Sequence, residues 1–256
     1  MEISTPRETA SFALSLLDLT NLRDDCDTAA IDELCRRAQT PYGTTAAICI
    51  WPRFVAQARI TLGEGHPVRI ATVVNFPSGN LPVSAVVEET KGAIRDGADE
   101  IDLVIPYEAF LAGNEAAVTE MVSAVRDACP NACLKVILET GELKDSARIS
   151  RASELAIEAG ADFIKTSTGK VSVNATLEAA DIMLRAIRDS RKRIGFKPAG
   201  GIGTVADADL YLRLAETIMG SDWIMPSTFR FGASSLLDDI MAALSGAPSQ
   251  RAASGY

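Results

Sequence analysis

Two lysines lie at the ends of short apolar segments, where burying a cation is normally unfavourable. Lys165 ends the run Phe163-Ile164-Lys165, and Lys197 ends the run Gly195-Phe196-Lys197. Two cations that meet inside a protein raise each other's cost of protonation, which lowers a lysine pKa and leaves a free amine able to attack a carbonyl. The pair therefore indicates Schiff-base chemistry, with Lys165 as the nucleophile.

Acidic residues accompany these lysines at other strand ends. Asp18 ends one candidate strand, and Asp102 lies within another. A buried carboxylate beside two lysines would keep one of them protonated and could relay protons through water. For a generic α/β chain, however, the favoured interpretation of Asp18 and Asp102 is a pair of buried salt bridges without chemistry. Glu139 is expected to pair with a strand lysine and to position it.

Three further side chains have a purely structural interpretation as well as a functional one. Lys135 and Lys170 can be solvated charges, and Cys49 more often packs as a small hydrophobic residue than reacts.

The single histidine, His66, cannot supply the several nitrogen ligands expected of a metal-dependent aldolase. The five cysteines are interpreted as reduced thiols.

Two glycine clusters indicate a phosphate site. Gly200-Gly201 and Gly232-Ala233-Ser234-Ser235 each follow a late strand and precede a helix. Free backbone N–H groups at helix starts attract anions, and barrels often hold phosphate after strands seven and eight. Each cluster alone is more often a tight turn, but together they predict a phosphorylated substrate.

The elements that must position these residues alternate between β and α patterns. Val-, Ile- and Leu-rich strands are expected at residues 45–50, 69–74, 100–105, 134–139, 163–165 and 195–197, with weaker candidates at 16–19 and 229–232. Helical stripes lie between them, namely Val83, Val86, Val87 and Ile94, then Val118, Met121, Val122 and Val125, and then Leu177, Ala180, Leu184 and Ile187. Helix starts are expected at Thr204 and Ser234, and glycine caps at Gly97 and Gly160.

This alternation in one chain predicts an α/β fold, a single (β/α)8 TIM barrel. A doubly wound open sheet is the structural alternative, but it usually carries a G-x-G-x-x-G loop, which this sequence lacks after its first strand. The barrel is expected over residues 1–245, followed by a loosely structured tail over residues 246–256.

Composition excludes several classes of protein. The chain has 256 residues, is 47% hydrophobic and carries a formal net charge of -9, so no nucleic-acid surface is indicated. No window is long and apolar enough for a membrane span, and the N-terminus lacks the pattern of a signal peptide. A soluble, cytoplasmic protein with no nucleic-acid or membrane partner is expected.

Eight segments carry a resemblance to a known family: residues 17–20, 45–50, 74–77, 97–102, 135–140, 163–170, 195–201 and 230–235. They resemble the deoxyribose-phosphate aldolases, class I enzymes of deoxynucleoside breakdown, from about Leu14 to Tyr256. The resemblance implies reversible cleavage of 2-deoxy-D-ribose 5-phosphate to D-glyceraldehyde 3-phosphate and acetaldehyde. It also implies that no metal or organic cofactor is needed, and that the enzyme is a homodimer.

The resemblance assigns roles to individual residues. It implies that Lys165 forms the Schiff base, that Lys197 lowers the pKa of the nucleophile, and that Asp102 belongs to the proton relay. Tyr256 matches a C-terminal tyrosine that assists proton transfer at the acetaldehyde carbon. The remaining positions match substrate contacts: Asp18 and Thr20 at the sugar hydroxyls, Cys49 elsewhere in the substrate site, and Lys170, Gly200, Gly201, Ser234 and Ser235 at the phosphate.

Two departures from the family pattern and two alternative functions stay open. Gly203 stands where enterobacterial relatives often have arginine, so less positive charge is expected at the phosphate end. Gly255 replaces a serine-like residue before the terminal tyrosine, which could loosen the tail. The alternative functions are another Schiff-base barrel, of the transaldolase or dehydratase kind, and a catalytically silent barrel that binds phosphosugars.

Overall fold

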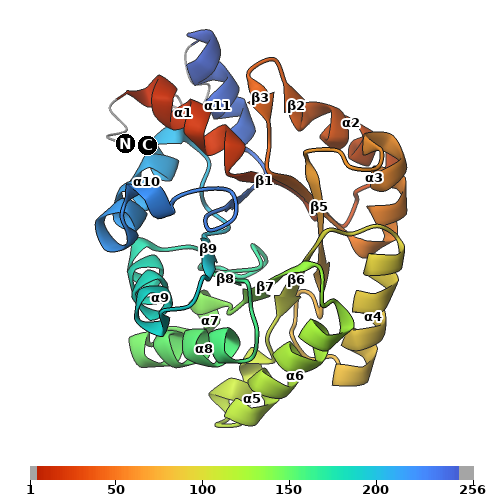
Figure 1. Cartoon of the computed structure of the whole chain (residues 1–256), viewed down its shortest axis with the longest axis vertical. Coiled ribbons are helices and arrows are strands. Elements are labelled where there is room, and N and C mark those ends of the chain that lie inside the picture. Colours follow the sequence, from red (N-terminus) through yellow and green to blue (C-terminus); the bar gives the residue numbers. More distant parts are fainter. Residues whose placement is uncertain (1–4, 248–256) are drawn as a thin grey trace.

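Strands and helices alternate along the chain in the computed structural model, which describes residues 5–247 (Figure 1). Eight strands form one parallel sheet, in which consecutive strands from β1 to β9 pair along the chain and β10 pairs with β1. They are β1 (Leu17–Asn21), β4 (Ala47–Ile50), β5 (Arg69–Val74), β6 (Glu100–Val104), β7 (Cys133–Ile137), β8 (Phe163–Lys165), β9 (Gly195–Lys197) and β10 (Phe231–Ala233).

The sheet closes on itself between its last two strands. Isolated parallel bridges join Phe196 to Phe229 and Ala199 to Gly232. Backbone hydrogen bonds support them, from Phe196 N to Thr228 O at 2.8 Å and from Gly232 N to Pro198 O at 2.9 Å. Closure confirms the predicted (β/α)8 barrel and excludes the doubly wound open sheet, which would have two free edges.

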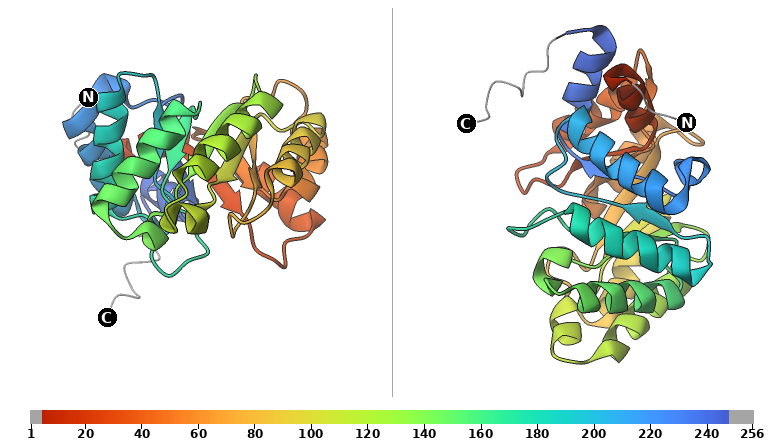
Figure 2. Two further views of the ribbon diagram at one scale, coloured as in Figure 1. Left: turned by 90° about the horizontal axis from the view of Figure 1, so that it is seen from below. Right: turned by 90° about the vertical axis from the view of Figure 1, so that its left-hand side faces the viewer.

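Helices surround the barrel, and at least one follows each strand (Figures 1 and 2). The helices after the strands are α2 (Thr28–Arg37), α3 (Val55–Leu62), α4 (Val83–Arg95), α5 (Tyr107–Leu111), α6 (Glu115–Ala128), α7 (Thr140–Leu143), α8 (Ser146–Glu158), α9 (Leu177–Ser190), α10 (Val205–Met219) and α11 (Leu236–Ser245). One more helix, α1 (Pro6–Ser15), precedes β1 and lies beside α10 and α11 (Figure 1). No helix within residues 5–247 has the length and apolar character needed to cross a bilayer.

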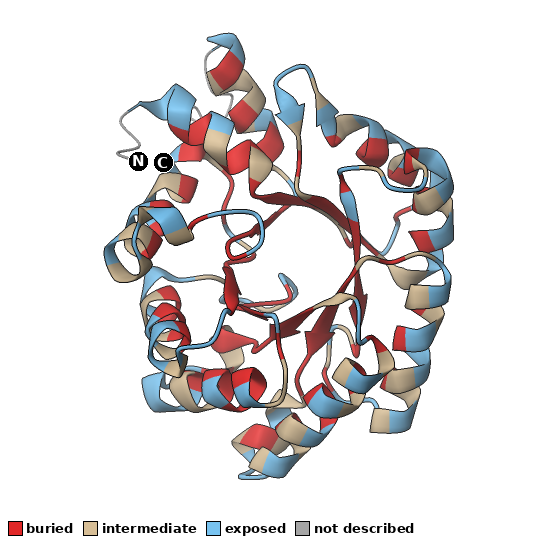
Figure 3. Ribbon diagram, in the orientation of Figure 1, coloured by how far each residue is buried: buried red, intermediate tan, exposed pale blue. Residues whose placement is uncertain are grey.

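Alternation along each strand divides its side chains between two environments. In β6, Ile101 and Leu103 belong to the large apolar core that the helices share, whereas Asp102 is also fully buried but belongs to the barrel interior. Figure 3 shows the eight strands of the barrel as almost continuously buried. Such strands appear as nearly unbroken apolar runs in sequence, so the few inward charged residues stand out against them.

Most boundaries that the sequence predicted are confirmed. Residues 69–74, 163–165 and 195–197 form strands with the expected limits, and the weak first and last candidates are real strands displaced by one or two residues. Thr204 caps α10 in a capping box with Asp207. Gly97 and Gly160, with φ of 102° and 107°, follow the ends of α4 and α8 as predicted.

Three local predictions are wrong or incomplete. The residue preceding α11 is Ser235 rather than Ser234, and it makes no side-chain capping hydrogen bond. Leu177 is exposed, because as the first residue of α9 it lies beyond the buried part of that helix's stripe. A two-stranded hairpin, β2 (Gln39–Thr40) and β3 (Gly43–Thr44), was not anticipated, since such short strands carry no periodicity. The predicted tail lies outside the described residues except for Gly246 and Ala247.

Candidate active site

A buried ion-pair network occupies the centre of the barrel. Asp102 accepts hydrogen bonds from three lysines: its Oδ1 from Lys135 Nζ at 2.9 Å, and its Oδ2 from both Lys165 Nζ and Lys197 Nζ at 2.8 Å. Strand register produces this convergence, because Asp102 pairs with Lys135 between β6 and β7, and Lys165 pairs with Lys197 between β8 and β9. Two lysines and a carboxylate singled out from sequence therefore meet at one point.

A second carboxylate holds the far side of the network. Asp18 Oδ2 lies 2.5 Å from Lys197 Nζ and 3.3 Å from Lys135 Nζ, and its Oδ1 accepts from Arg230 at 2.6 Å. Lys197 has room to reach Asp18 because β10 carries a glycine there, since a Cβ on Gly232 would lie only 3.1 Å from Lys197 Cε. The interpretation of Asp18 and Asp102 as salt-bridge partners is therefore correct, but the bridges run to the candidate catalytic lysines.

Glu100 and Arg230 extend the network along the barrel interior. Glu100 contacts Arg230 Nη2 at 2.8 Å and Lys135 Nζ at 2.5 Å. The network thus joins four cations to three carboxylates. The cations are Lys135, Lys165, Lys197 and Arg230, and the carboxylates are Asp18, Glu100 and Asp102. Within residues 5–247, Lys165 is the cation of this network with a single carboxylate partner, and it shares that partner with two other lysines.

The electrostatics of the network favour ionised carboxylates and charged supporting lysines. Burial by itself would raise the pKa of Asp102, but Lys135, Lys165 and Lys197 outweigh burial and hold that pKa well below its usual range. Burial would likewise lower the pKa of Lys197, yet Asp102 and Asp18 keep it above the ordinary value. Lys197 is therefore a persistent positive charge beside Lys165.

A pocket of about 640 Å³ opens at the carboxyl ends of the strands, next to this network. Lys165 lies on its wall, although the residue as a whole is only 3% exposed. Asp102, Lys135 and Lys197 are fully buried and do not line the pocket. Of the three lysines bonded to Asp102, Lys165 is thus the one that a bound molecule can reach.

The predicted substrate contacts divide between this pocket and the barrel interior. The pocket wall includes most of them, namely Thr20, Lys170, Gly200, Gly201, Ser234 and Ser235. Asp18 and Cys49 are fully buried and do not line it, and burial raises the pKa of the Cys49 thiol. Tyr256 lies outside the described residues. The pocket thereby unites the ends of β1, β8, β9 and β10, as the barrel topology requires.

The two glycine clusters differ at their helix starts. At α10 the first backbone N–H groups are already occupied: Gly203 N and Thr204 N donate to Asp207 Oδ2 at 3.0 and 2.9 Å, and Val205 N donates to Asp239 Oδ2 at 2.7 Å. The prediction of free N–H groups at the start of this helix is therefore wrong. At α11 no side chain caps the helix, so its start suits an anion.

Two predictions about charged residues are also wrong. Lys135 is fully buried rather than solvated, because it lies on the inward face of β7 opposite Asp102. Its position between apolar Leu134 and Val136 was a usable signal, since strand alternation places those two residues on the other face. Within residues 5–247 Glu139 pairs with no lysine; its carboxylate accepts from Thr168 Oγ1 at 2.5 Å and Thr168 N at 3.2 Å.

Glu139 instead fixes the loop that follows β8. It adopts a left-handed conformation with φ of 57°, and burial raises its pKa. Thr168 lines the pocket and in turn accepts a hydrogen bond from Lys170 N at 3.0 Å. Strain at a buried left-handed residue persists where the surroundings determine the conformation, as this pair of hydrogen bonds does. The carboxylate thus holds one wall of the pocket in place.

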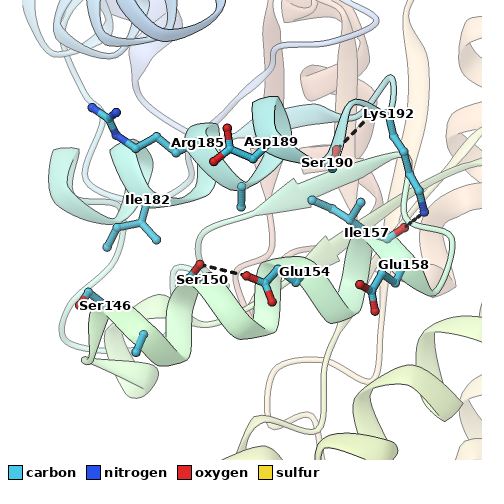
Figure 4. A pocket seen from close by; sticks show the side chains of 12 residues that line it. Ser146, Ser150, Glu154, Ile157, Glu158, Ile182, Arg185, Asp189, Ser190 and Lys192 are labelled. Atoms are coloured by element: carbon cyan, nitrogen blue, oxygen red, sulfur yellow. Dashed lines mark hydrogen bonds between the residues drawn. The ribbon is translucent and has the colours of Figure 1, made fainter.

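A second hollow lies on the outer surface between α8 and α9 (Figure 4). Its charged side chains include Glu154, Arg185 and Asp189, and Lys192 Nζ donates to Ile157 O at 3.3 Å. None of the predicted site residues lies there. Within residues 5–247, no group of three or more His, Cys, Asp or Glu side chains is arranged to hold a metal ion.

Comparison with known proteins gives a consistent result. The sequence profile of the DeoC/LacD family aldolases matches residues 12–240. A deoxyribose-phosphate aldolase of Agrobacterium fabrum is 70% identical over 257 aligned residues, which span 100% of this chain and 99% of the relative.

Solved structures agree in fold. One from Toxoplasma gondii superimposes with a TM-score of 0.87 at 26% identity, covering 95% of this chain and 96% of that one. A tetrameric deoxyribose phosphate aldolase from Aeropyrum pernix gives a TM-score of 0.74 at 26% identity, covering 93% and 92%. The carboxyl transferase domain of Rhizobium etli pyruvate carboxylase, at 14% identity and a TM-score of 0.59, shares the fold alone over 94% of this chain and 45% of that one.

Proposed function

Because the chain belongs to the DeoC/LacD aldolase family, we propose that it is a deoxyribose-phosphate aldolase. The reaction is the reversible retro-aldol cleavage of 2-deoxy-D-ribose 5-phosphate to D-glyceraldehyde 3-phosphate and acetaldehyde. The observation that carries the chemistry is the position of Lys165. Of the three lysines that share Asp102, it alone faces the pocket, so it is the amine that can form a Schiff base with the substrate.

The amine begins the reaction. Neutral Lys165 Nζ adds to the C1 aldehyde, and loss of water gives an iminium ion, which is a better electron sink than the carbonyl. The C3 hydroxyl then loses its proton while the C2–C3 bond breaks. C3 becomes the aldehyde of glyceraldehyde 3-phosphate, and the bonding electrons form an enamine on Lys165. Protonation at C2 and hydrolysis by water release acetaldehyde and regenerate the amine.

Asp102 serves the proton transfers as a relay. The surrounding lysines hold its pKa well below the usual range, so the ionised carboxylate is the stable form in the resting site. A proton taken from the C3 hydroxyl through water is therefore passed onward rather than stored. Once the amine of Lys165 has become an iminium, Asp102 Oδ2 retains its hydrogen bond from Lys197 and stays oriented.

Lys197 is assigned as the cation that keeps Lys165 reactive. It is fully buried, holds its charge through Asp18 and Asp102, and shares Oδ2 of Asp102 with Lys165. A fixed positive charge beside an amine disfavours protonation of that amine. Asp18 acts through Lys197 in this scheme, which agrees with its absence from the pocket wall.

The remaining residues complete the substrate site. Thr20 is assigned to the sugar hydroxyls, and Lys170 with the two glycine clusters is assigned to the phosphate, because all of them line one pocket. Cys49 is buried behind the wall and contributes shape. Tyr256 is proposed to assist protonation of the enamine carbon, so removing it should slow proton exchange at acetaldehyde more than it weakens substrate binding.

A trapping experiment tests the assignment. Borohydride added with 2-deoxyribose 5-phosphate should leave a reduced adduct on Lys165, located by peptide mass analysis, and activity should persist in the presence of a chelator. An adduct on another lysine contradicts the residue assignment. No cleavage and no adduct would favour the silent phosphosugar-binding barrel, whereas an adduct formed only with other carbonyl compounds would favour another Schiff-base enzyme.

We further propose a cytoplasmic homodimer that acts in deoxynucleoside breakdown. A charged sugar phosphate does not cross membranes unaided, so the enzyme that consumes it is expected in the compartment where it forms. Light scattering at several concentrations measures the subunit number. A mass other than twice that of the chain contradicts the dimer, and the relative from Aeropyrum pernix is itself a tetramer.

A further inference from the structure

One arginine in the pocket wall has no place in the scheme above. Arg37 is the last residue of α2 and lines the pocket together with Leu34. Its side chain is 31% exposed, whereas that of the preceding Arg36 is 72% exposed and pairs with Glu33 on the same helix. The two neighbours thus differ in direction: Arg37 faces the pocket and Arg36 faces solvent.

Arg37 lies over the start of α11. Its guanidinium donates to Asp238, which belongs to the first turn of that helix. No side chain caps this helix start, and Ser234 and Ser235 line the pocket immediately before it. This contact is the one hydrogen bond of the Arg37 guanidinium among residues 5–247, so its other N–H groups remain available to a ligand.

The phosphate end of the pocket needs positive charge beyond that of Lys170. Asp207 and Asp239 already occupy the backbone N–H groups at the start of α10, and Asp238 adds a third carboxylate nearby. Gly203, which also lines the pocket, contributes no side chain. A dianionic phosphate would meet like charge there unless an arginine or lysine offsets it.

Two other cations of the pocket wall contact groups away from the start of α11, so Arg37 supplements Lys170 at the phosphate and does not replace it. Arg23 makes a two-point contact with Asp25, at 2.9 and 2.7 Å, and its side chain is 76% exposed. Lys170 is 3.4 Å from Asp24 and lies over the ring of Trp51, on the β1 side of the pocket. Arg37 is the cation placed at the uncapped helix start, and a guanidinium matches phosphate oxygens in a two-point geometry.

We propose that Arg37 is a specificity-determining residue that binds the phosphate of the substrate by exchanging Asp238 for it. The inference rests on the proposed function, since it concerns the phosphate of that substrate. Free enzyme keeps the arginine in place through Asp238. Bound enzyme uses the same guanidinium, together with the helix start of α11, to hold the phosphate and so selects phosphorylated over unphosphorylated sugars.

Steady-state kinetics on two substrates tests this proposal. Arg37→Gln should raise KM for 2-deoxyribose 5-phosphate about tenfold, the loss expected for one charge-assisted hydrogen bond. It should leave kcat for that substrate, and kcat/KM for unphosphorylated 2-deoxyribose, within twofold of the wild-type values. The inhibition constant of inorganic phosphate against 2-deoxyribose cleavage should increase by the same factor. Arg36→Gln, one residue away, is the matched control and should change none of these quantities.

Asp238→Asn separates ligand binding from a merely structural role. If Arg37 binds phosphate, removing its competitor lowers KM for the phosphorylated substrate. If Arg37 only fastens α2 to α11, Asp238→Asn and Arg37→Gln weaken both substrates in parallel, which overturns the proposal. An unchanged preference for phosphate in Arg37→Gln also overturns it. A wild-type enzyme that does not cleave 2-deoxyribose 5-phosphate contradicts the proposed function itself.

Discussion

Lys165 and Lys197 donate hydrogen bonds to the same atom, Oδ2 of Asp102, each at 2.8 Å. The two amines therefore compete for one carboxylate oxygen. Lys197 has a second carboxylate partner in Asp18 at 2.5 Å, whereas within residues 5–247 Lys165 pairs with Asp102 alone. This asymmetry also agrees with access, since only Lys165 of the two lines the pocket.

Lys197→Leu should shift the pH dependence of catalysis. Without the competing cation, Asp102 stabilises the protonated amine of Lys165 more strongly. The rising limb of the kcat/KM profile should therefore move to higher pH. Activity near neutral pH should fall at least tenfold and recover in part at alkaline pH. The measurement is a pH–rate profile beside that of Lys91→Leu, which removes a half-exposed surface lysine. An unshifted profile in Lys197→Leu contradicts the proposed coupling.

Asp102→Asn should abolish the relay. An amide cannot accept a proton, so kcat should fall by about 10²- to 10⁴-fold, the usual contribution of proton transfer by a positioned side chain. Stability should fall too, because three buried lysines lose a charged partner. Asp99→Asn is the control: Asp99 pairs with Arg59 at 2.7 Å outside the pocket, so its loss lowers stability without lowering kcat. Equal kcat losses in the two variants would mean that folding, not chemistry, had been disturbed.

The sequence predicted the barrel because its signals are local. Buried parallel strands appear as unbroken apolar runs, and eight of them alternate with amphipathic helices, so even strands of three residues such as 163–165 and 195–197 could be located. The short hairpin of β2 and β3 could not, since two-residue strands have no period. Thr204 could be predicted as a helix cap because Asp207 follows three residues later, whereas no such partner identified the start of α11.

The site was predicted only where a residue is unusual by itself. Lysines that end apolar strands are rare, so Lys165 and Lys197 were conspicuous. Lys135 was misjudged because its surroundings depend on register: Asp102 reaches it across β6 and β7, which are 33 residues apart. Arg37 was missed because it belongs to a helix of ordinary charge pattern, and only the fold brings that helix beside the start of α11.

Lys135→Met should destabilise the barrel without touching the pocket. Its ammonium contacts Glu100 at 2.5 Å, Asp102 at 2.9 Å and Asp18 at 3.3 Å, so its removal leaves buried carboxylates without their shared cation. The expected loss in the free energy of unfolding is about 3–5 kcal/mol. Urea unfolding measures it, with Lys91→Met as the exposed control, whose change should stay within about 0.5 kcal/mol. A small loss in Lys135→Met would mean that the carboxylates take up protons instead.

Stability should fall steeply at acid pH. The pKa values of Asp18 and Asp102 are lowered in the folded protein, chiefly because the nearby lysines outweigh burial. Each carboxylate therefore contributes stability that is fully present above its unfolded pKa of about 3.9 and is lost as the pH falls toward the folded value. Below about pH 4, the unfolded state binds more protons. The free energy of unfolding should then decrease with acidification, by up to about 1.4 kcal/mol per pH unit for each proton taken up.

Between neutral and mildly acid pH, the ionisation of Glu139 should affect stability with the opposite sign to that of Asp18 and Asp102. Burial raises its pKa in the folded protein, so the folded state takes up this proton before the unfolded state does. Its charge therefore costs stability at neutral pH, and this cost declines as the pH falls through the raised pKa toward the unfolded value of about 4.3. Urea midpoints measured from pH 8 to pH 3 should increase slightly before the steep acid loss. Glu139→Gln, which keeps an oxygen to accept from Thr168, should remove the increase and retain the acid loss; a rise that persists in this variant would assign it to another group.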